Sequence, residues 1–372
     1  MKTKLLLTTI VSAFFILPSA FGQGPLTPPG APAPTMKTLA QIEPRTAITN
    51  TASAVTITNS GSYYLTGNLT VSSGDAITIA ANGVTLDLKG FTVRSALASP
   101  AGSGILLTNA LRDITILNGH ILGGLTNNGF GVYGGNGFAN GIAISSNAPA
   151  NVLVANVTVS GCPIYGIQLA VLAEGLVNAT VVEACTVRTV GSVGILASTI
   201  KGCEVTDCGG FAIYGDHVSD CRGAGGNGAY GVYAVTAQNC TGSSSGNGHG
   251  IDATTALNCT GNNSGNGLGI SATTALNCYG NNFSVGTGLF ADTAQNCYGY
   301  SITSGTGINA TTAQNCHGVS GGSGTGIFTD LAQGCYGQST SGTGLNAFIA
   351  NSCHGISTSG TPLSVTHNVN SF

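Results

Sequence analysis

The C-terminal part of the chain repeats with a period of 19 residues, and this period constrains the fold more than any other feature. Each unit reads Gly-x-Gly-Ile/Leu-x-Ala-x-Thr-Ala-x-Asn-Cys-x-Gly and ends in a polar run of Ser, Asn and Gly. The cysteines that mark the period are Cys221, Cys240, Cys259, Cys278, Cys297, Cys316 and Cys335, with Cys353 following after 18 residues. A fixed period of this length is typical of solenoids, in which each unit contacts only its neighbours.

The composition of the repeat argues against helix, because Gly, Asn, Thr and Ser are poor helix formers. Apolar residues instead alternate over short runs such as Ile251-Asp252-Ala253, and Gly and Asn interrupt these runs. This pattern is typical of short strands separated by bends. Three strands and three bends fit into 19 residues, so the sequence predicts an all-β fold with one parallel β-helix coil in each repeat.

The repeat also predicts which side chains face inward. The Ile/Leu position and the Ala two residues later are invariant in character between repeats, apart from Thr329, whereas the position between them varies freely, as solvent-facing positions do. Asn precedes the cysteine in most repeats and tolerates the left-handed conformation of a sharp bend. Stacked Asn side chains could then bond along the column. We expect each cysteine to point inward and the next residue to point outward.

Twelve cysteines in an exported chain would ordinarily suggest disulfides. Stacked parallel strands, however, give equivalent residues parallel Cβ vectors about 4.8 Å apart, which opposes the torsion that a disulfide needs. The ladder therefore predicts free, buried thiols that act as small apolar groups. No Cys-x-x-Cys pair is present, so we expect no zinc. Cys208 lies five residues after Cys203, outside the period, and is expected to be the most exposed thiol.

The N-terminus has the features of a secretory signal over residues 1–22. Lys2 and Lys4 precede an apolar run from Leu5 to Leu17, and Ala20-Phe21-Gly22 forms a small-x-small cleavage site. The apolar run is short for a membrane span. We therefore expect an exported protein without a transmembrane segment, located outside the cell, at its surface or in the periplasm.

Two short segments separate this leader from the predicted solenoid over 45–372. Residues 23–35 form a Pro-rich linker. In 36–44, Met36, Leu39 and Ile42 recur at helical spacing before Pro44. This spacing predicts a short N-terminal helix that caps the first coil, whose strand edges would otherwise be unpaired.

The charge balance limits the classes of partner. Only 6% of the residues are charged and the formal net charge is −3, so no basic surface is available for a nucleic-acid backbone. After Arg222 the sequence contains no Lys, Arg or Glu.

Several N-terminal runs resemble the opening coils of the right-handed parallel β-helix, pectate-lyase-like superfamily. These runs are Gly61–Val71, Asp75–Ile79, Gly83–Val93, Ile114–Ile121 and Val152–Val159. The Asn-Cys-x-Gly repeat is similar to rungs common in that superfamily, and the resemblance covers roughly residues 50–360. It implies a right-handed parallel β-helix but little about activity, because the superfamily mixes lyases, hydrolases and binding proteins. In its enzymes, excursions like the Gly-rich 119–141 wall the substrate cleft; a plain surface insertion is the alternative.

The middle coils contain a cluster of charge, with nine of the 23 charged residues between residues 174 and 222. Glu183 and Lys201 should stack in one outward column, and Glu204 and Arg222 in another. Such pairs are ordinary sheet stabilisers of about 0.2–1 kcal/mol. The alternative is a catalytic site in a polysaccharide lyase or glycoside hydrolase acting on uronate-rich glycans. Its candidate residues are Glu183, Arg188, Lys201, Glu204, Asp207 and Arg222.

Catalytic motifs are otherwise weak. Gly248-His249-Gly250 matches a polygalacturonase motif, but His249 occupies a variable position and the aspartates expected beside it are missing. Calcium-assisted elimination needs a group of acidic ligands, for which Asp207, Asp216 and Asp220 are candidates whose spacing matches no motif. We therefore expect no cofactor, with calcium possible only if the protein is a lyase.

An aromatic column follows the cysteines of the later repeats: Tyr279, Tyr298, His317, Tyr336 and His354. Rings repeated every ~4.8 Å could bind an extended glycan, or they could simply stabilise the sheet by stacking. We expect an exported, non-catalytic protein that is structural or binds polysaccharide. The repeat dissolves into Leu363–Phe372 without an evident helical cap, so the last edge is covered either by this tail or by another subunit. A homo-oligomer formed through an uncapped C-terminal end is a further hypothesis.

Overall fold

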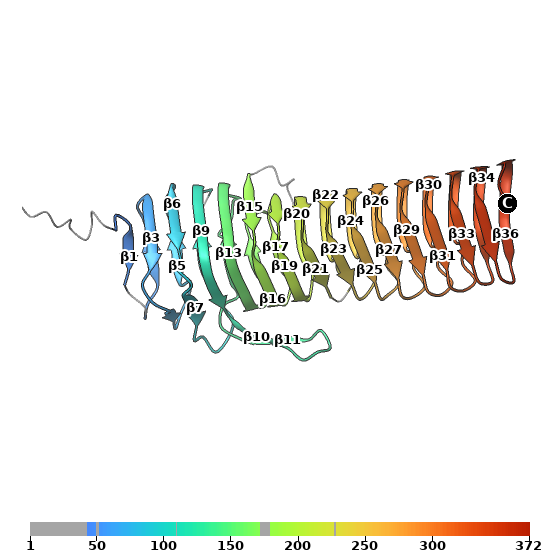
Figure 1. The fold of residues 1–372 in the computed structure, drawn as a ribbon. Helices are drawn as coiled ribbons and strands as arrows, with labels where there is room; N and C mark the ends of the chain where they lie inside the picture. Colours follow the sequence, from blue (N-terminus) through green and yellow to red (C-terminus); the bar gives the residue numbers. More distant parts are fainter. Residues whose placement is uncertain (1–42, 50–51, 109, 172–178, 227) are drawn as a thin grey trace, which may run out of the picture. The chain divides into compact units, whose positions relative to one another are not determined.

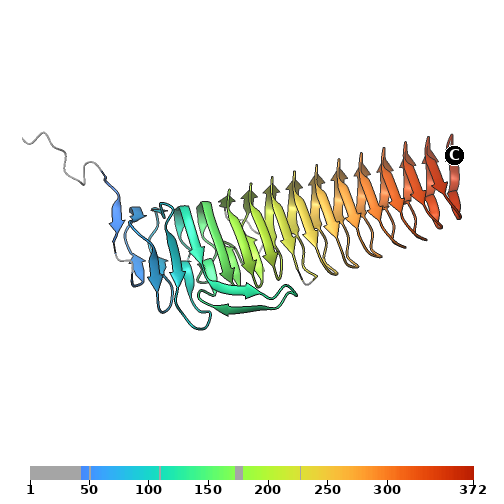
Figure 2. The same cartoon turned by 60° about the horizontal axis from the view of Figure 1, so that its bottom comes forward.

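The computed structural model describes residues 43–49, 52–108, 110–171, 179–226 and 228–372. The chain divides into two units, Met1–Pro44 and Arg45–Phe372, and the second contains all the described strands. It is a solenoid of parallel strands that stack coil upon coil along one axis (Figures 1 and 2). The predicted all-β parallel β-helix is confirmed.

Three parallel ladders of strands form the wall. The first ladder begins with β2 (Val55–Ile57), β5 (Ile77–Ile79), β8 (Ser103–Leu107), β12 (Asn140–Ile144), β14 (Tyr165–Gln168) and β17 (Val193–Leu196). The second begins with β1 (Thr46–Ile48), β3 (Gly61–Leu65) and β6 (Val84–Asp87), and continues in β15 (Thr180–Glu183) and β18 (Thr199–Lys201).

The third ladder contains β4 (Leu69–Val71), β7 (Thr92–Ser95), β16 (Thr186–Val190), β19 (Glu204–Cys208), β21 (Arg222–Gly225), β23 (Thr241–Ser244), β25 (Thr260–Asn263), β27 (Tyr279–Asn282), β29 (Tyr298–Ser301), β31 (His317–Ser320), β33 (Tyr336–Ser339) and β35 (His354–Ser357). Two long strands, β9 (Arg112–Leu122) and β13 (Ala150–Cys162), run through the second and third ladders in succession.

The 19-residue coils contain two strands rather than the three that the sequence predicts. The first and second ladders merge into bent strands: β20 (Ile213–Ser219), β22 (Val232–Gln238), β24 (Ile251–Leu257), β26 (Ile270–Leu276), β28 (Leu289–Gln295), β30 (Ile308–Gln314), β32 (Ile327–Gln333), β34 (Thr343–Asn351) and β36 (Thr361–Val369). In β24 the pairing with β26 skips Thr254, so one strand turns a corner there. The three predicted segments are present, but one bend is too slight to end the strand.

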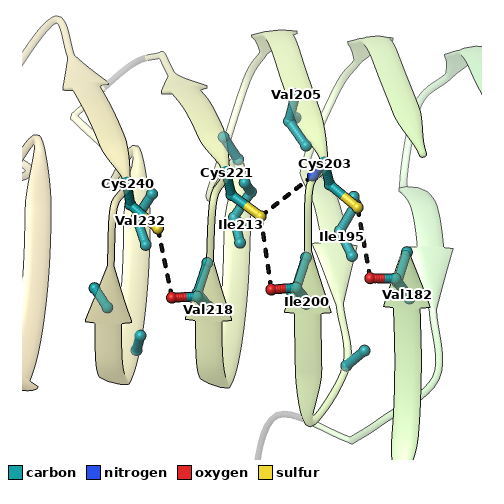
Figure 3. Packing of buried hydrophobic residues seen from close by; sticks show 14 of the residues in the cluster. Val182, Ile195, Ile200, Cys203, Val205, Ile213, Val218, Cys221, Val232 and Cys240 are labelled. Carbon is teal, nitrogen blue, oxygen red and sulfur yellow. Dashed lines mark hydrogen bonds between the residues drawn. The ribbon is translucent and has the colours of Figure 1, made fainter. Parts of the chain in front are cut away.

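The core consists of columns that run the length of the tube. The Ile/Leu and Ala positions of every repeat are buried, as are all twelve cysteines, which are unbridged. Figure 3 shows how the thiols contact the wall: the Sγ atoms of Cys203, Cys221 and Cys240 lie 3.5, 3.6 and 3.4 Å from carbonyl oxygens of the preceding coil. The predicted ladder of buried free thiols is confirmed from Cys185 to Cys353.

The prediction that Cys208 is the most exposed thiol is wrong. Its side chain is only 1% exposed, and its Sγ donates to the carbonyl oxygens of Ser192 and Phe211 at 2.8 and 3.3 Å. Cys208 is outside the ladder period because it belongs to a second inward column, in which Cys162, Val190 and Cys208 are register partners. The column lies at the other end of the third-ladder strands, where the spacing from the ladder cysteines does not predict burial.

The residues that precede the ladder cysteines form a column of bends, and the predicted left-handed backbone conformation is confirmed there. Asn239, Asn258, Asn277, Asn296 and Asn315 have φ between 51° and 54°. Each donates its side-chain amide to the residue one coil earlier, over 3.0 to 3.4 Å. Asn fits because it tolerates positive φ and its amide both donates and accepts along the column.

Replacing one member of this column separates the two roles of Asn. Asn277→Ala should lower the free energy of unfolding by about 1–2 kcal/mol, because alanine strains at positive φ and removes the bonds to Asn258 and Asn296. Asn277→Gly keeps the permissive backbone, as Gly334 does naturally at φ 62°, and should cost less. Urea unfolding of the two variants provides the comparison; equal losses would mean that backbone strain contributes nothing.

The C-terminal tail does not leave the repeat as predicted but forms one more coil. Strand β36 pairs with β34 from Thr361 to Val369. Asn368 pairs with Ala350 of an inward column. Ser371 follows Cys353 in the ladder column, and its hydroxyl oxygen accepts a hydrogen bond from the backbone N–H of Cys353 at 3.0 Å. The backbone N–H of Ser371 donates to Oδ1 of Asn368 at 2.9 Å. Polar residues thus end two of the inward columns, while Leu363 and Val365 continue the Ile/Leu and Ala columns into the last coil.

The N-terminal predictions fall mostly outside the described residues. The signal segment, the Pro-rich linker and residues 36–42 of the predicted capping helix are among these, while Glu43 and Pro44 lie in irregular structure. No helix in the described part of the chain is long and apolar enough to cross a membrane.

Candidate functional site

The structure distributes the predicted charged residues over two faces. Glu183 and Lys201 are register partners on β15 and β18 of the second ladder. The Lys201 Nζ lies 4.0 Å from Glu183 Oε1, and both side chains are about half exposed. An exposed pair of this kind contributes at most about 1 kcal/mol. The pair lies on adjacent coils and is consistent with the predicted role as a sheet stabiliser.

Glu204 and Arg222 lie around the next corner, on the third ladder. They are register partners at the first positions of β19 and β21, as predicted. The bend at Gly202 separates them from Lys201, with φ 59°. The stacking of both predicted pairs is therefore confirmed, but the two pairs lie on different sheets.

Asp207 occupies a distinct environment at the far end of β19. Its backbone is left-handed, with φ 55°, like Gly161 and Thr189 at the equivalent position of the two preceding coils. The pairing with β21 is irregular between Val205 and Cys208. Such irregularities re-aim a side chain, and here the carboxylate points toward a hairpin that projects from an earlier coil.

This hairpin is the Gly-rich excursion that the sequence indicates. Strands β10 (Gly124–Asn127) and β11 (Tyr133–Asn136) pair antiparallel and lie beside later coils of the solenoid (Figures 1 and 2). Oδ1 of Asp207 accepts hydrogen bonds from the Tyr133 hydroxyl at 3.0 Å and from the Asn127 amide at 2.5 Å. These bonds join segments about 75–80 residues apart in sequence and fix the hairpin against the third ladder.

The pKa of Tyr133 reflects this position. Burial raises the pKa of the phenol, and the hydrogen bond to the Asp207 carboxylate and its negative charge raise the pKa further. Tyr133 therefore stays protonated at any physiological pH. It acts as a donor to Asp207 and is poorly suited to act as a base.

A cleft of about 300 Å³ opens between the hairpin and the coils. Phe130 at the hairpin tip is 88% exposed and forms part of its wall. The lining is completed by Asn127, Gly129, Gly131, Tyr133, Asp207, Cys208, Ala224, Gly225, Gly226 and Ser245. Among these residues one carboxylate is present and none carries a positive charge. The cleft thus combines two aromatic rings with amide, hydroxyl and carboxylate groups, which suits a neutral, hydroxyl-rich ligand.

The aromatic column lies further along the same ladder. Tyr279, Tyr298, His317, Tyr336 and His354 are successive register partners on β27 to β35. Centroids of neighbouring rings are 4.5 to 5.4 Å apart, and Phe372 packs on His354 at 4.7 Å. The predicted column is therefore continuous in space.

The rings of the column contact one another, so their edges face the solvent. Tyr279 and Tyr298 are parallel within 4°, whereas His317 meets both neighbouring tyrosines edge to face. Nε2 of His317 is buried without a hydrogen-bond partner among the described residues, and burial lowers the pKa of His317. At the stacked pair of Tyr279 and Tyr298, a ligand along this column would meet hydroxyls and ring edges, because each ring covers a face of the other.

His249 is engaged in contacts that stabilise neighbouring coils. Its Nδ1 accepts a hydrogen bond from the backbone N–H of Leu268 at 3.1 Å, and its ring packs on Tyr230 with centroids 5.0 Å apart. Burial lowers the pKa of His249. In the described ranges no three His, Cys, Asp or Glu side chains are grouped to hold a metal ion. Whether a cofactor is needed stays a prediction.

Sequence reasoning missed the hairpin side of the cleft. It identified the excursion and, separately, Asp207, but not the contact of Asn127 and Tyr133 with Asp207. The only signal was an Asn- and Tyr-containing segment within a Gly-rich insertion. The direction of the hairpin follows from packing against later coils, which a local pattern does not encode.

Comparison with known proteins adds little to this description. No protein-family model matches the sequence, and no curated protein shows significant sequence similarity to it. Among solved structures, the chain is similar to the A-module of the mannuronan C-5 epimerase of Azotobacter vinelandii, with 13% identity and a TM-score of 0.34. The alignment covers 83% of this chain and 90% of that module. A likeness this distant carries no argument, and the strand registers alone establish that this protein is a parallel β-helix.

Proposed function

We propose that the protein is an exported, non-catalytic β-helix that binds polysaccharide on the third ladder, with the cleft beneath the hairpin as its principal contact. The observation that carries the proposal is the attachment of this hairpin by Tyr133 and Asn127 to Asp207, which leaves Phe130 projecting over a concave polar surface. Export is proposed from the signal-like residues 1–22.

The chemistry of the cleft favours a glycan over other ligand classes. Aromatic rings pack against the apolar faces of sugars, while amides, hydroxyls and a carboxylate bond to sugar hydroxyls. The aromatic column extends this surface along the ladder, where the hydroxyls of Tyr279 and Tyr298 are one coil of ~4.8 Å apart and that of Tyr336 is two coils further on. An elongated polymer could contact both regions, which a small ligand could not.

The same lining supports binding more than catalysis. Inverting glycoside hydrolysis needs two carboxyl groups about 6.5–9.5 Å apart, and Asp207 is the single carboxylate among the lining residues described. Elimination from a uronate needs a base and a positive group to neutralise the substrate carboxylate. Glu183, Lys201, Glu204 and Arg222 do not line the cleft. A lyase or hydrolase remains the alternative that the experiment must test.

Phe130→Ala should weaken glycan binding about tenfold, equivalent to about 1.4 kcal/mol, because it removes the exposed aromatic wall of the cleft without touching the core. The measurement is affinity for immobilised neutral and uronate polysaccharides, first screened with the wild-type mature chain. Phe348→Ala is the matched control, since Phe348 is 54% exposed and lies on β34, away from the third ladder.

Two further arms complete the test. Combined replacement of Tyr279, Tyr298 and Tyr336 by alanine should weaken binding to long chains more than to short oligomers, because only long chains would reach the column. Incubation with uronate polymers should release neither reducing ends nor unsaturated products. Release of such products, or equal binding by the Phe130→Ala variant and the wild type, would overturn the proposal.

A further inference from the structure

A second concave surface lies on the first ladder, on a different face from the hairpin cleft. It is a groove of about 250 Å³ over β22, β24, β26 and β28. Its lining consists of Tyr233, Ala234, Asp252, Ala253, Thr254, Ser271, Ala272, Thr273, Phe290 and Asp292. The function proposed above uses none of these residues.

The groove is a gap in a column of outward side chains. Tyr214, Tyr233, Asp252, Ser271 and Phe290 are successive register partners. The rings of Tyr214 and Tyr233 stack at 4.6 Å, so the other face of Tyr233 closes one end of the gap. Phe290 closes the opposite end, three coils of about 4.8 Å each further on. The two coils between them carry the short side chains of Asp252 and Ser271, which leaves an aromatic-walled slot.

The polar groups of the slot are acidic or hydroxylic. Asp252 is half-buried on its floor, and Asp292 lies at its rim, one coil after Thr273 in the column of Thr254 and Thr273. Beyond Arg222 the chain contains three aspartates and no Lys, Arg or Glu. The negative charge of this slot is therefore not neutralised by a nearby basic side chain, and an anionic ligand would be repelled.

We propose that this slot binds protonated amino sugars, consecutive hexosamine residues with free amines, of a cationic glycan. The Tyr233 and Phe290 rings, three coils apart, would each pack on a different sugar and attract its ammonium group through the ring face. Asp252 and Asp292, two coils apart, would each accept a charge-assisted hydrogen bond from an ammonium group. Ser271, Thr254 and Thr273 would bond to ring hydroxyls. Burial, which raises the pKa of Asp252, gives a further reason for this carboxylate to favour a cationic partner.

The test compares three tetrasaccharides by calorimetry: glucosamine, N-acetylglucosamine and glucose oligomers. The wild-type chain should bind the free-amine oligomer at least tenfold more tightly than the other two. The Asp252→Asn/Asp292→Asn variant should lose this preference, since both carboxylates become neutral with little change in shape. Phe290→Ala, at an exposed position, should weaken binding of the amine oligomer about tenfold.

Asp330→Asn is the matched control. Asp330 is exposed and occupies the position of Asp292 two repeats later, outside the slot, so its replacement should change affinity less than twofold. Equal losses in all the aspartate variants, or equal binding of an oligolysine peptide, would show attraction by charge alone and overturn the inference. Phe130→Ala should leave this binding unchanged, which separates failure here from failure of the proposed function.

Discussion

Gly299→Ala is expected to lower the free energy of unfolding by about 3 kcal/mol or more, the upper range for overpacking a close-packed interior. Gly299 lies on the third ladder directly after the outward Tyr298 and faces the interior, where the start of β30 approaches it closely. A Cβ atom there would overlap the backbone carbonyl of Gly307 and Cγ1 of Ile308. The Gly307 carbonyl is held by a hydrogen bond from the backbone N–H of Leu289 at 3.0 Å, and Gly299 is held between Gly280 and Gly318 in its ladder, so relaxation is costly.

The same approach recurs at Gly280, Gly318 and Gly337, whose added Cβ atoms would meet the carbonyls of Gly288, Gly326 and Gly344. Gly134→Ala is the control, because nothing lies within 4 Å of a Cβ built there and its φ is not positive. Urea unfolding should show a loss for Gly299→Ala only, and limited proteolysis should cleave near this coil first. A Gly299→Ala variant as stable as Gly134→Ala would contradict the inferred tightness of the tube.

The architecture of the regular coils could be predicted from the sequence alone. The 19-residue period, the Ile/Leu and Ala positions and the Asn-Cys bend specify the coil, because each repeat satisfies the same local pattern and the pattern recurs. Inward and outward positions follow from strand alternation. The stacking of Glu183 with Lys201 and of Glu204 with Arg222 then follows from counting residues from the bend, and the registers confirm both pairs.

The rest depended on contacts that do not repeat. The environment of Cys208 follows from Val190 and Cys162, whose 18- and 28-residue intervals differ from the period. The cleft arises where an insertion of unique sequence packs on Asp207. The slot on the first ladder arises because the large side chain of Tyr233 is followed by the smaller one of Asp252 on the next coil. It could be located only once the register of the coils was known. These candidates therefore depend on residues that differ between repeats or lie in insertions, which the period does not specify.

Alkaline pH is expected to destabilise the protein strongly between about pH 9 and 12, and Cys162 and Cys208 report on this loss. Burial raises the pKa of both thiols from 9.0 to about 12. A thiol whose folded-state pKa is raised stabilises the fold fully below pH 9, where both states are protonated. That contribution is lost as the pH rises toward 12, since the unfolded chain releases its proton first. The difference corresponds to about 4 kcal/mol for each thiol.

Replacing these two cysteines by valine should make the pH dependence less steep. Val190 already occupies the same inward column between Cys162 and Cys208, so the Cys162→Val/Cys208→Val variant should fold at pH 7 with similar stability. Its free energy of unfolding, measured in urea from pH 7 to 11, should decline less than that of the wild type, because two fewer thiols ionise on unfolding. The ladder thiols are common to both proteins and cancel in the comparison. Parallel pH profiles would mean that the second column ionises in the folded state, which would require water to reach Cys208 from the hairpin cleft that it lines.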